Sequence, residues 1–326
     1  MKNKLLYKLR SGKNPKIIYY SINVFRLITP KYFFRMRLQR RLVSLSRRKD
    51  KEYIEQRVNY YNKLSGGVKL PASAARLSEH KMSKQKVYFF DTYQYTRWFD
   101  DSFRWGFCPG DVTYVPEYPS IVKSRPLVDN NENSVLMKLD KVRHFIFVND
   151  RKKFTDKKNM VIFRGKVKGK PSRKLFMKMY FNHPMCDLGD VSKNTNDPVE
   201  WRTEKKTINE HLDYKFIMAL EGIDVASNLK WIMSSNSIAV MPRPTCETWF
   251  MEGTLIPNYH YIEIKPDFSD LEGRLSYYIE HVDESLEIIK HAHEFVEQFK
   301  NKKRESLISL LVLDKYFRVT GQKERD

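Results

Sequence analysis

The cations that follow one predicted strand have the types and spacing to bind an anion. Residues 160–165 (MVIFRG) predict a short strand, and Gly165 permits a tight turn at its end. The turn leads into a predicted helix at 172–181, and helix N-termini favour negative charge. Because no Walker A or GxGxxG pattern is present, a diphosphate site and a solvated basic turn are equal alternatives here. The cations of this stretch are Arg164, Lys166, Lys168, Lys170 and Arg173.

A second polar stretch surrounds the predicted strand at 214–220 (YKFIMAL), which begins with Tyr214 and Lys215. A helix is predicted at 226–234, and small polar residues lie at both of its ends. Such residues at a strand–helix corner suit ribose and phosphate oxygens, although helix capping and turn formation would also explain them. The residues concerned are Gly222, Ser227, Asn228, Lys230, Ser235 and Asn236.

Two carboxylates stand in distinctive surroundings. Glu117 lies between two prolines in PEYP, directly after a predicted strand at 111–116 (DVTYVP). A rigidly held carboxylate there can act as a general base, and an exposed acid in a proline-rich turn is the alternative. Glu247 and Trp249 lie in ETWFMEG, where an aromatic face and a carboxylate suit a sugar. Core packing of Trp249 is an equal interpretation.

The elements that must position these side chains alternate regularly in the second half of the chain. Strand–helix alternation with short connections predicts βαβ units and a parallel sheet, which binds ligands outside the carboxyl ends of its strands. The expected strands are 160–165, 214–220, 237–241 and 259–264, and the expected helices are 172–181, 226–234, 270–280 and 284–299.

The first half of the chain gives weaker patterns. A helix is expected at 50–64, and an apolar C-terminal helix at 306–317 must pack on another part of the fold. A charged segment at 149–158 marks a domain boundary. Short apolar runs predict strands at 86–90 (KVYFF), 111–116 and 143–148 (RHFIFV).

The first 49 residues carry most of the excess charge of this 326-residue chain. They contain seven Lys and eight Arg and no acidic residue, and so hold 15 of the formal net charge of +21. Isoleucine, phenylalanine and tyrosine residues interleave with these cations, a composition typical of segments that lie on an anionic membrane surface. No apolar run of about 18 residues predicts a membrane span. A basic arm for RNA and a solvated helix face are the alternatives.

The sequence predicts no metal site. Three cysteines are widely spaced, the histidines are scattered, and no DxD-like acidic cluster lies in a suitable loop.

Taken in order, these motifs resemble the CAP10 or lipopolysaccharide-modifying glycosyltransferases of glycosyltransferase family 90, which includes the protein O-glucosyltransferases. The motifs are FRG with its basic loop, YKF…EG…SNLKW…SNS, and PNYHYIEIKPDFSDL. The resemblance covers about residues 85–300 and is tightest over 159–299. It implies a GT-B-like α/β fold, in which two Rossmann-like domains with parallel sheets face a cleft. It also implies inverting transfer from a nucleotide sugar without an essential metal.

The resemblance assigns roles to single residues by position. Arg164 and Arg173 match family cations near the donor diphosphate, and residues 214–216 match a YKY-like strand. Asn228 stands where protein-glucosylating members have an Arg, and Lys230 or the 166–170 loop is expected to supply the charge. The full set expected to bind the donor is Arg164, Gly165, Lys166, Arg173, Tyr214, Lys215, Gly222, Ser227, Asn228, Lys230, Ser235, Asn236, Glu247 and Trp249.

Glu117, directly before Tyr118-Pro119, stands where protein-glucosylating members carry a catalytic Asp. The resemblance thus implies that Glu117 is the catalytic base, although its side chain is one methylene longer. The signal sequence and paired cysteines of the secretory members are missing, which indicates the bacterial branch. We expect the enzyme on the inner face of the cell membrane, with a UDP-linked donor and a lipid-linked oligosaccharide acceptor such as lipopolysaccharide core.

Four segments follow from this interpretation. A basic amphipathic membrane segment is expected at 1–49, an acceptor-side Rossmann-like domain at 50–157, and a nucleotide-sugar-binding Rossmann-like domain at 158–300. A C-terminal helix within 301–326 is expected to pack back on the first domain. No nucleic-acid partner is expected. Two other functions stay open at this point, a nucleic-acid-binding protein that uses the basic arm and a noncatalytic envelope-assembly scaffold.

Overall fold

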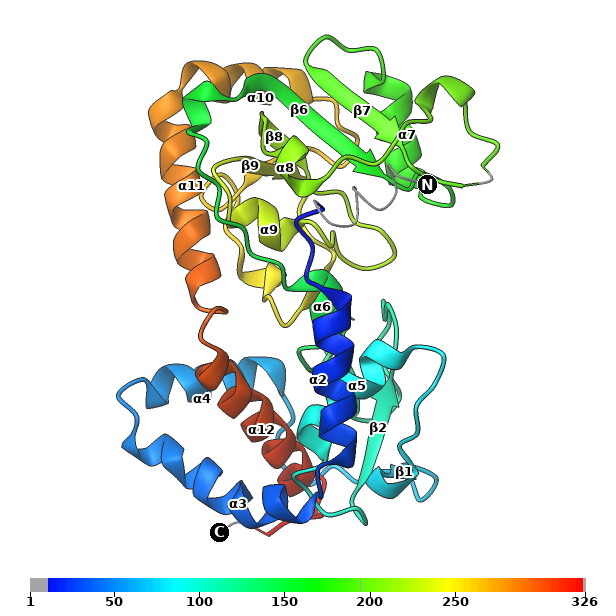
Figure 1. Ribbon diagram of the computed structural model, residues 1–326, viewed down its shortest axis with the longest axis vertical. Coiled ribbons are helices and arrows are strands. Elements are labelled where there is room, and N and C mark those ends of the chain that lie inside the picture. Colours follow the sequence, from blue (N-terminus) through cyan, green and yellow to red (C-terminus); the bar gives the residue numbers. More distant parts are fainter. Residues whose placement is uncertain (1–10, 194, 325–326) are drawn as a thin grey trace. The chain divides into compact units, whose positions relative to one another are not determined.

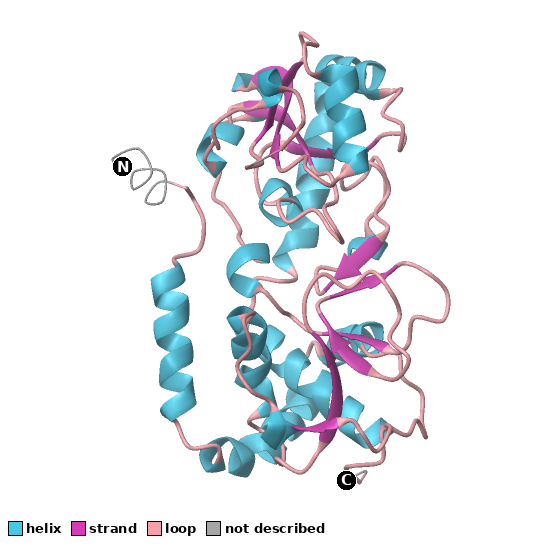
Figure 2. Ribbon diagram, turned by 90° about the vertical axis from the view of Figure 1, so that its right-hand side faces the viewer, coloured by secondary structure: helices cyan, strands magenta, loops and turns pink. Residues whose placement is uncertain are grey.

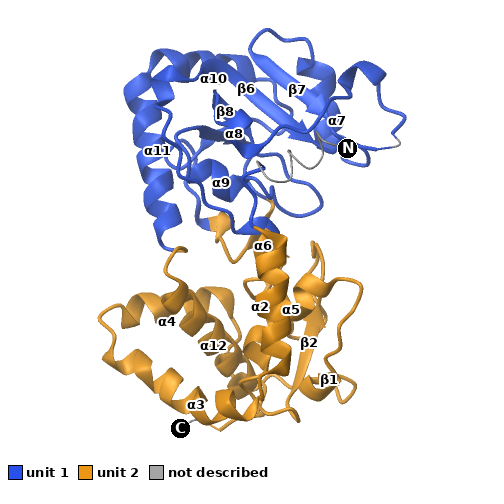
Figure 3. Ribbon diagram, viewed as in Figure 1, with its two compact units in different colours: residues 1–14, 143–244, 254–298 blue, residues 15–142, 245–253, 299–326 orange. Residues whose placement is uncertain are grey.

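Five parallel strands form the sheet of one compact unit in this computed structural model (Figure 1). The structure describes residues 11–193 and 195–324. Unit 1 comprises residues 1–14, 143–244 and 254–298 (Figure 3). Its strand order is β11-β9-β8-β6-β7. The strands are β6 (Lys158–Gly165), β7 (Cys186–Asp190), β8 (Tyr214–Met218), β9 (Ile238–Met241) and β11 (Ile262–Glu263).

Side chains on both faces of this sheet are buried. On one face, Val161 and Phe216 belong to a core that also contains side chains from three helices. On the other face, Ile162 and Ile217 are also buried, because successive residues of a strand point to opposite sides. Burial on both faces is what a parallel sheet requires, and it explains the continuous apolar strands. The three helices are α7 (Pro171–Tyr180), α10 (Leu271–Glu280) and α11 (Val282–Glu297).

Unit 2 comprises residues 15–142, 245–253 and 299–326 and contains a mixed sheet (Figures 2 and 3). In the order β1-β2-β3-β5, the first pair is antiparallel and the other two pairs are parallel. A separate antiparallel pair joins β4 to β10. The strands are β1 (Ala75–Arg76), β2 (Arg104–Cys108), β3 (Ser120–Val122), β4 (Ser124–Pro126), β5 (Ser134–Leu136) and β10 (Cys246–Thr248).

The longer helices of unit 2 surround its C-terminal helix, which contacts α3, α4 and α5. These helices are α2 (Lys16–Ile28), α3 (Tyr32–Val43), α4 (Lys51–Tyr61), α5 (Lys86–Thr96) and α12 (Lys302–Val319). The described ranges also contain three shorter α-helices, α6 (Lys141–His144), α8 (Ile208–His211) and α9 (Leu229–Met233). Short 3₁₀ helices occur at Ser44–Arg47, Leu77–Glu79, Phe154–Asp156, Val199–Trp201 and Glu252–Thr254. None of the helices in the described ranges is both long and apolar enough to cross a membrane.

A buried carboxylate on α12 joins the separate chain segments of unit 2. Glu305 accepts hydrogen bonds from Arg57 Nη1 at 2.6 Å, Lys138 Nζ at 3.0 Å and Trp249 Nε1 at 2.6 Å. The Trp249 ring stacks on Tyr61 with the ring centroids 3.8 Å apart. Burial opposes ionisation of Glu305, but Lys138 and Arg57 outweigh it and hold its pKa below the usual glutamate range. This stabilisation is present above the usual glutamate pKa and is lost as the pH falls through the lowered value.

The expected α/β class with parallel sheets is confirmed, whereas three strands predicted in the first half are wrong. Residues 86–90 begin helix α5, whose side chains are buried on most sides, as in a helix inside a core. Residues 111–116 form no strand, because the Ser124 hydroxyl satisfies both backbone polar groups of Val112. Residues 143–148 contain the end of α6 followed by irregular chain.

The bounds of the two units differ from the four segments expected from the sequence. The segment 245–253 and helix α12 belong to the same unit as residues 15–142. The expected segment 1–49 contains α2, α3 and a 3₁₀ turn, and its first ten residues lie outside the described part of the chain.

Replacing Glu305 by Ala is expected to lower the free energy of unfolding by about 3 kcal/mol or more, because Arg57 and Lys138 would lose a buried carboxylate partner. Urea unfolding at neutral pH measures this loss. Glu287→Ala is the matched control, since Glu287 forms an exposed pair with Lys290 and its loss should leave the free energy of unfolding almost unchanged. Equal losses in the two variants would contradict the role given to Glu305.

Candidate functional site

The order of the strands reverses at β6 in unit 1. From β6 the chain passes through α7 to β7 on one side, and it later returns to form β8 on the other side of β6 (Figure 1). The loops that follow β6 and β8 therefore start at the carboxyl ends of neighbouring strands and run in different directions. Open parallel sheets bind ligands outside the carboxyl ends of their strands at such a reversal. This edge of the sheet is the candidate site.

Arg173, in the first turn of α7, ties the two diverging loops together. Its Nη1 donates to Lys166 O at 3.0 Å in the β6 loop. Its Nη2 donates to Leu220 O at 2.7 Å and its Nε donates to Glu221 O at 3.1 Å, both in the β8 loop. A guanidinium has five N–H groups, so two of them have no partner in the described part of the chain.

A glycine from each loop lies beside this guanidinium. A Cβ at Gly165 would lie 2.5 Å from the Phe163 ring and 3.3 Å from Arg173 Nη1. A Cβ at Gly222 would lie 3.5 Å from Arg173 Nη2. A side chain at position 165 would therefore overlap the Phe163 ring, so this position requires glycine. At position 222 a Cβ would lie at an ordinary contact distance from Arg173.

The charge of Arg173 is not balanced by a nearby carboxylate. Burial, together with the positive charge of Arg143, lowers the pKa of Arg173 to about 10. No ion pair to Arg173 occurs within residues 11–193 and 195–324. A cation that donates only to neutral carbonyls gains energy when an anion binds beside it. The site is thus suited to a ligand with phosphate groups.

The backbone of the β6 loop has a different role from the one expected. The Val167 amide donates to Asp190 Oδ1 and to Ser192 Oγ, both at 3.0 Å, and the Lys168 amide donates to Ser192 Oγ at 3.1 Å. These amides are therefore engaged inside the protein, so the loop offers its cationic side chains to a ligand. Sequence reasoning missed Asp190 and Ser192 because Asp187 and Gly189 interrupt the apolar pattern of β7, whose only signal is the short run CDLGD.

The other expected residues of this edge differ in exposure. Lys166 is exposed, and Ser227 and Asn228 are half-buried in the β8 loop. Asn228 Nδ2 donates to Met218 O at 2.9 Å and so holds the start of α9 against the end of β8. Lys230 is fully buried in α9, so it belongs to the packed interior of unit 1.

Arg164 is the penultimate residue of β6, but its guanidinium is turned toward the neighbouring strand β7. It forms an ion pair with the Asp187 carboxylate, and its Nη1 donates to Asp187 O at 2.7 Å. The Tyr214 hydroxyl donates to the same carboxylate. Burial opposes ionisation of Asp187, but the hydrogen bonds from Tyr214 and Arg164 outweigh it and hold its pKa below the usual aspartate range. Arg164 and Tyr214 thus link neighbouring strands.

Three further expected residues lie at the amino ends of the strands, on the edge opposite Arg173. Lys215 is the second residue of β8, and its Nζ lies 5.0 Å from the Phe154 ring centroid. Ser235 Oγ donates to Ile232 O at 2.7 Å, and the Asn236 amide donates to Asp150 Oδ2 at 3.0 Å. The structure therefore does not bring these residues together with Arg173.

Glu247 and Trp249 lie in unit 2, on the segment that contains β10. Glu247 is buried, where its Oε1 accepts from Arg125 Nε at 2.7 Å and its other oxygen accepts from the Tyr60 hydroxyl. Trp249 is fully buried against Tyr61. Both side chains have packing roles in this unit.

Glu117 is exposed in the loop between β2 and β3. Asn133 Nδ2 donates to Pro116 O and to Glu117 O, both at 3.0 Å, and the Tyr316 hydroxyl donates to Pro119 O at 2.7 Å. No hydrogen bond or ion pair to the Glu117 carboxylate occurs among the described residues. The backbone is therefore held on both sides of an available carboxylate.

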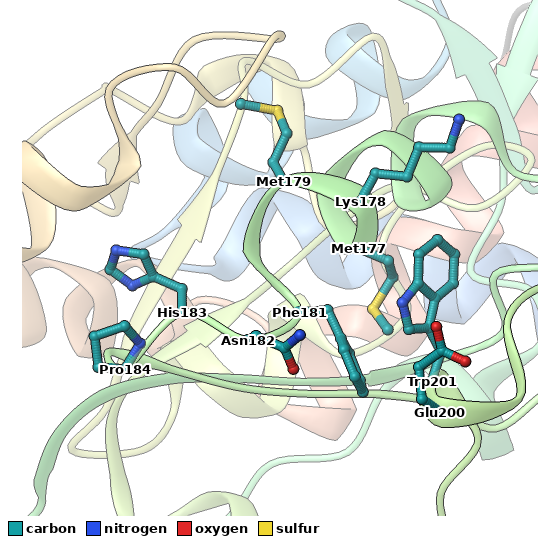
Figure 4. Close-up of a pocket in the computed structure, with 9 residues that line it drawn as sticks. All are labelled: Met177, Lys178, Met179, Phe181, Asn182, His183, Pro184, Glu200 and Trp201. Carbon is teal, nitrogen blue, oxygen red and sulfur yellow. The ribbon is translucent and has the colours of Figure 1, made fainter.

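A hollow of about 410 Å³ lies at the C-terminal end of α7 (Figure 4). Its lining includes Lys178, His183 and Trp201. Because α7 begins at the carboxyl edge of the sheet and runs away from it, this hollow is separate from the candidate site.

The profile of glycosyl transferase family 90 matches residues 132–319, more than half of the chain. The chain belongs to glycosyltransferase family 90. A protein of Dichelobacter nodosus described as "O-glucosyltransferase LpsA" is 41% identical over 265 residues, which cover 81% of this chain and 82% of that protein. The family assignment and the expectation of a glycosyltransferase are both confirmed.

In this family 90 glycosyltransferase, Arg164→Ala is expected to lower the free energy of unfolding by about 2 kcal/mol, because the half-buried Asp187 loses a charged donor. Chemical denaturation measures the effect. Arg243→Ala removes a more exposed cation paired with Glu263 and should change stability by less than about 1 kcal/mol. A wild-type stability for the Arg164 variant would show that its ion pair is not structural.

Proposed function

We propose that this glycosyltransferase is an inverting enzyme that takes a sugar from a nucleotide sugar, with UDP as the nucleotide. The diphosphate would bind at the carboxyl edge of the unit 1 sheet. The observation that carries this proposal is the Arg173 guanidinium, which lies at the reversal of strand order without a carboxylate partner among the described residues. Lys166 and the other exposed cations of the β6 loop would add charge.

The proposed reaction is a displacement at the anomeric carbon. An acceptor hydroxyl forms the new C–O bond while the bond from that carbon to the diphosphate oxygen breaks, with inversion of configuration. Glu117 takes the hydroxyl proton as general base, which requires an ionised and accessible carboxylate. Arg173 and the loop cations stabilise the charge that develops on the departing diphosphate. The exposure of Glu117 and its fixed backbone support this assignment.

The acceptor and the location are also proposals. The related protein carries the description O-glucosyltransferase, which makes UDP-glucose the first donor to test. We infer a lipid-linked surface glycan such as lipopolysaccharide core as the acceptor, on the inner face of the cell membrane. Transfer without an essential metal and the GT-B arrangement of two domains around a cleft stay predictions.

Donor binding is tested by thermal shift with a panel of UDP-, GDP-, ADP- and CMP-sugars in the presence of EDTA. We expect a selective shift with one nucleotide sugar. Arg173→Ala should weaken its binding about tenfold or more, because charged hydrogen bonds to the diphosphate are lost. Lys178→Ala removes a cation from the far end of the same helix and is the control. A panel without any shift would contradict the proposed donor.

Glu117→Gln should keep donor affinity and lower kcat about a hundredfold or more, because the amide cannot accept the proton. Sugar transfer measured alongside the thermal shift separates these two effects. Glu132→Gln changes a second exposed carboxylate of unit 2 and should leave both quantities unchanged. Wild-type turnover in the Glu117 variant would remove this residue from the mechanism.

A further inference from the structure

Helix α2 exposes its apolar side chains. Ile17 is 83% exposed, Phe25 is 67% exposed and Ile28 is 73% exposed. Helical spacing places these residues along one side, since residues three, eight and eleven positions apart share a face. The six large apolar side chains exposed on α2 are Ile17, Ile18, Ile22, Val24, Phe25 and Ile28.

The inner side of α2 holds the polar contacts. The Tyr19 hydroxyl donates to Asp91 Oδ1 at 2.9 Å, and Arg97 Nη1 donates to Arg26 O at 2.8 Å. Asn23 is buried, and its Nδ2 donates to Tyr19 O at 2.8 Å. These contacts fix the rotation of α2 on unit 2, so the helix cannot turn its apolar face inward without breaking them.

The next helix continues the exposed apolar surface and adds positive charge. Tyr32, Phe33 and Met36 are each more than half exposed at the start of α3, which follows α2 directly in the chain (Figure 1). Along the described part of the chain, several arginines of this segment form no ion pair: Arg37, Arg40, Arg41 and Arg47. The first acidic residue of the whole chain is Asp50.

We propose that the α2–α3 face, formed by the exposed apolar residues of Ile17–Ile28 together with Tyr32, Phe33 and Met36, docks on the surface of an anionic lipid bilayer. The apolar side chains would enter the boundary between headgroups and acyl chains, and the arginines of α3 would pair with lipid phosphates. This face would be the part of the protein that holds it at the proposed membrane location, whatever sugar transfer the enzyme catalyses.

Two other occupants fit the surface less well. RNA would neutralise the arginines but leave a large apolar face in water, which is rare on a protein surface without a partner. A second copy of the chain would bring together two segments that each hold 15 cations and no anion, and these would repel. An anionic bilayer satisfies both the apolar and the cationic parts of the face.

Vesicle flotation of the full chain tests the proposal, with phosphatidylcholine vesicles that contain or lack phosphatidylglycerol. We expect binding to the anionic vesicles that weakens with salt. The double variant Phe25→Ser/Ile28→Ser should bind about tenfold less tightly or weaker, because apolar burial is lost. Arg37→Glu/Arg40→Glu should cause a loss of at least about tenfold by charge reversal. Val199→Ser, at an apolar residue that is 68% exposed in unit 1, is the matched control.

Unchanged melting temperatures would show that the variants are folded, as expected for exposed positions. Wild-type flotation of the Phe25/Ile28 variant would overturn the proposal. The proposal would also be overturned if sedimentation showed a dimer that this variant dissociates. It would be overturned as well if the arginines were required for RNA binding and the protein did not bind vesicles. Failure here is distinct from failure of the proposed function. A donor thermal shift without vesicle binding removes only the docking surface, and vesicle binding without a donor shift removes only the proposed transfer.

Discussion

The reversal of strand order at β6 is the constraint on which the functional part of this structure depends. Because β7 and β8 lie on opposite sides of β6, the loops after β6 and β8 leave neighbouring strand ends in different directions. A side chain is then needed to hold them, and Arg173 does this by donating to the backbone of both. The same group is the cation that we propose binds a diphosphate. Under this proposal, one residue has both a structural and a binding role.

Unit 2 depends on buried carboxylates in a comparable way. Glu305 and Glu247 are both buried, and each is paired with an arginine that comes from a distant part of the sequence. Such pairs add little stability compared with apolar side chains of the same shape. Removing one partner, however, strongly destabilises the fold. They therefore favour one particular assembly of the three chain segments over other compact arrangements.

Sequence reasoning worked best where local pattern and tertiary environment agree. The continuous apolar strands of unit 1 and the helices between them were predictable, because a sheet covered on both faces needs them. The strand expected at 86–90 failed because an apolar run of this length is equally compatible with a buried helix, and α5 packs on most of its sides. Arg173 and Gly165 of the candidate site could be proposed from the sequence, because Gly165 ends the predicted strand and Arg173 lies at the start of the helix that follows it. Three other features could not be predicted, because they depend on packing between residues far apart in the sequence. They are the burial of Lys230, the ion pair of Arg164 with Asp187, and the position of Trp249 in unit 2.

The chain passes between its two units five times, and this sets an order for their assembly during synthesis. All of unit 1 has been made by residue 298, and its sheet is formed from one almost continuous stretch. Unit 2 begins earlier in the sequence but needs β10 for its second sheet and α12 for the carboxylate that pairs with Arg57, so it cannot be complete until α12 has left the ribosome. The N-terminal half, with its exposed apolar helix, must therefore wait as an incomplete structure while the later half folds. A fragment that ends before α12 lacks one of the three chain segments of unit 2, so we do not expect a folded unit 2 from such a fragment.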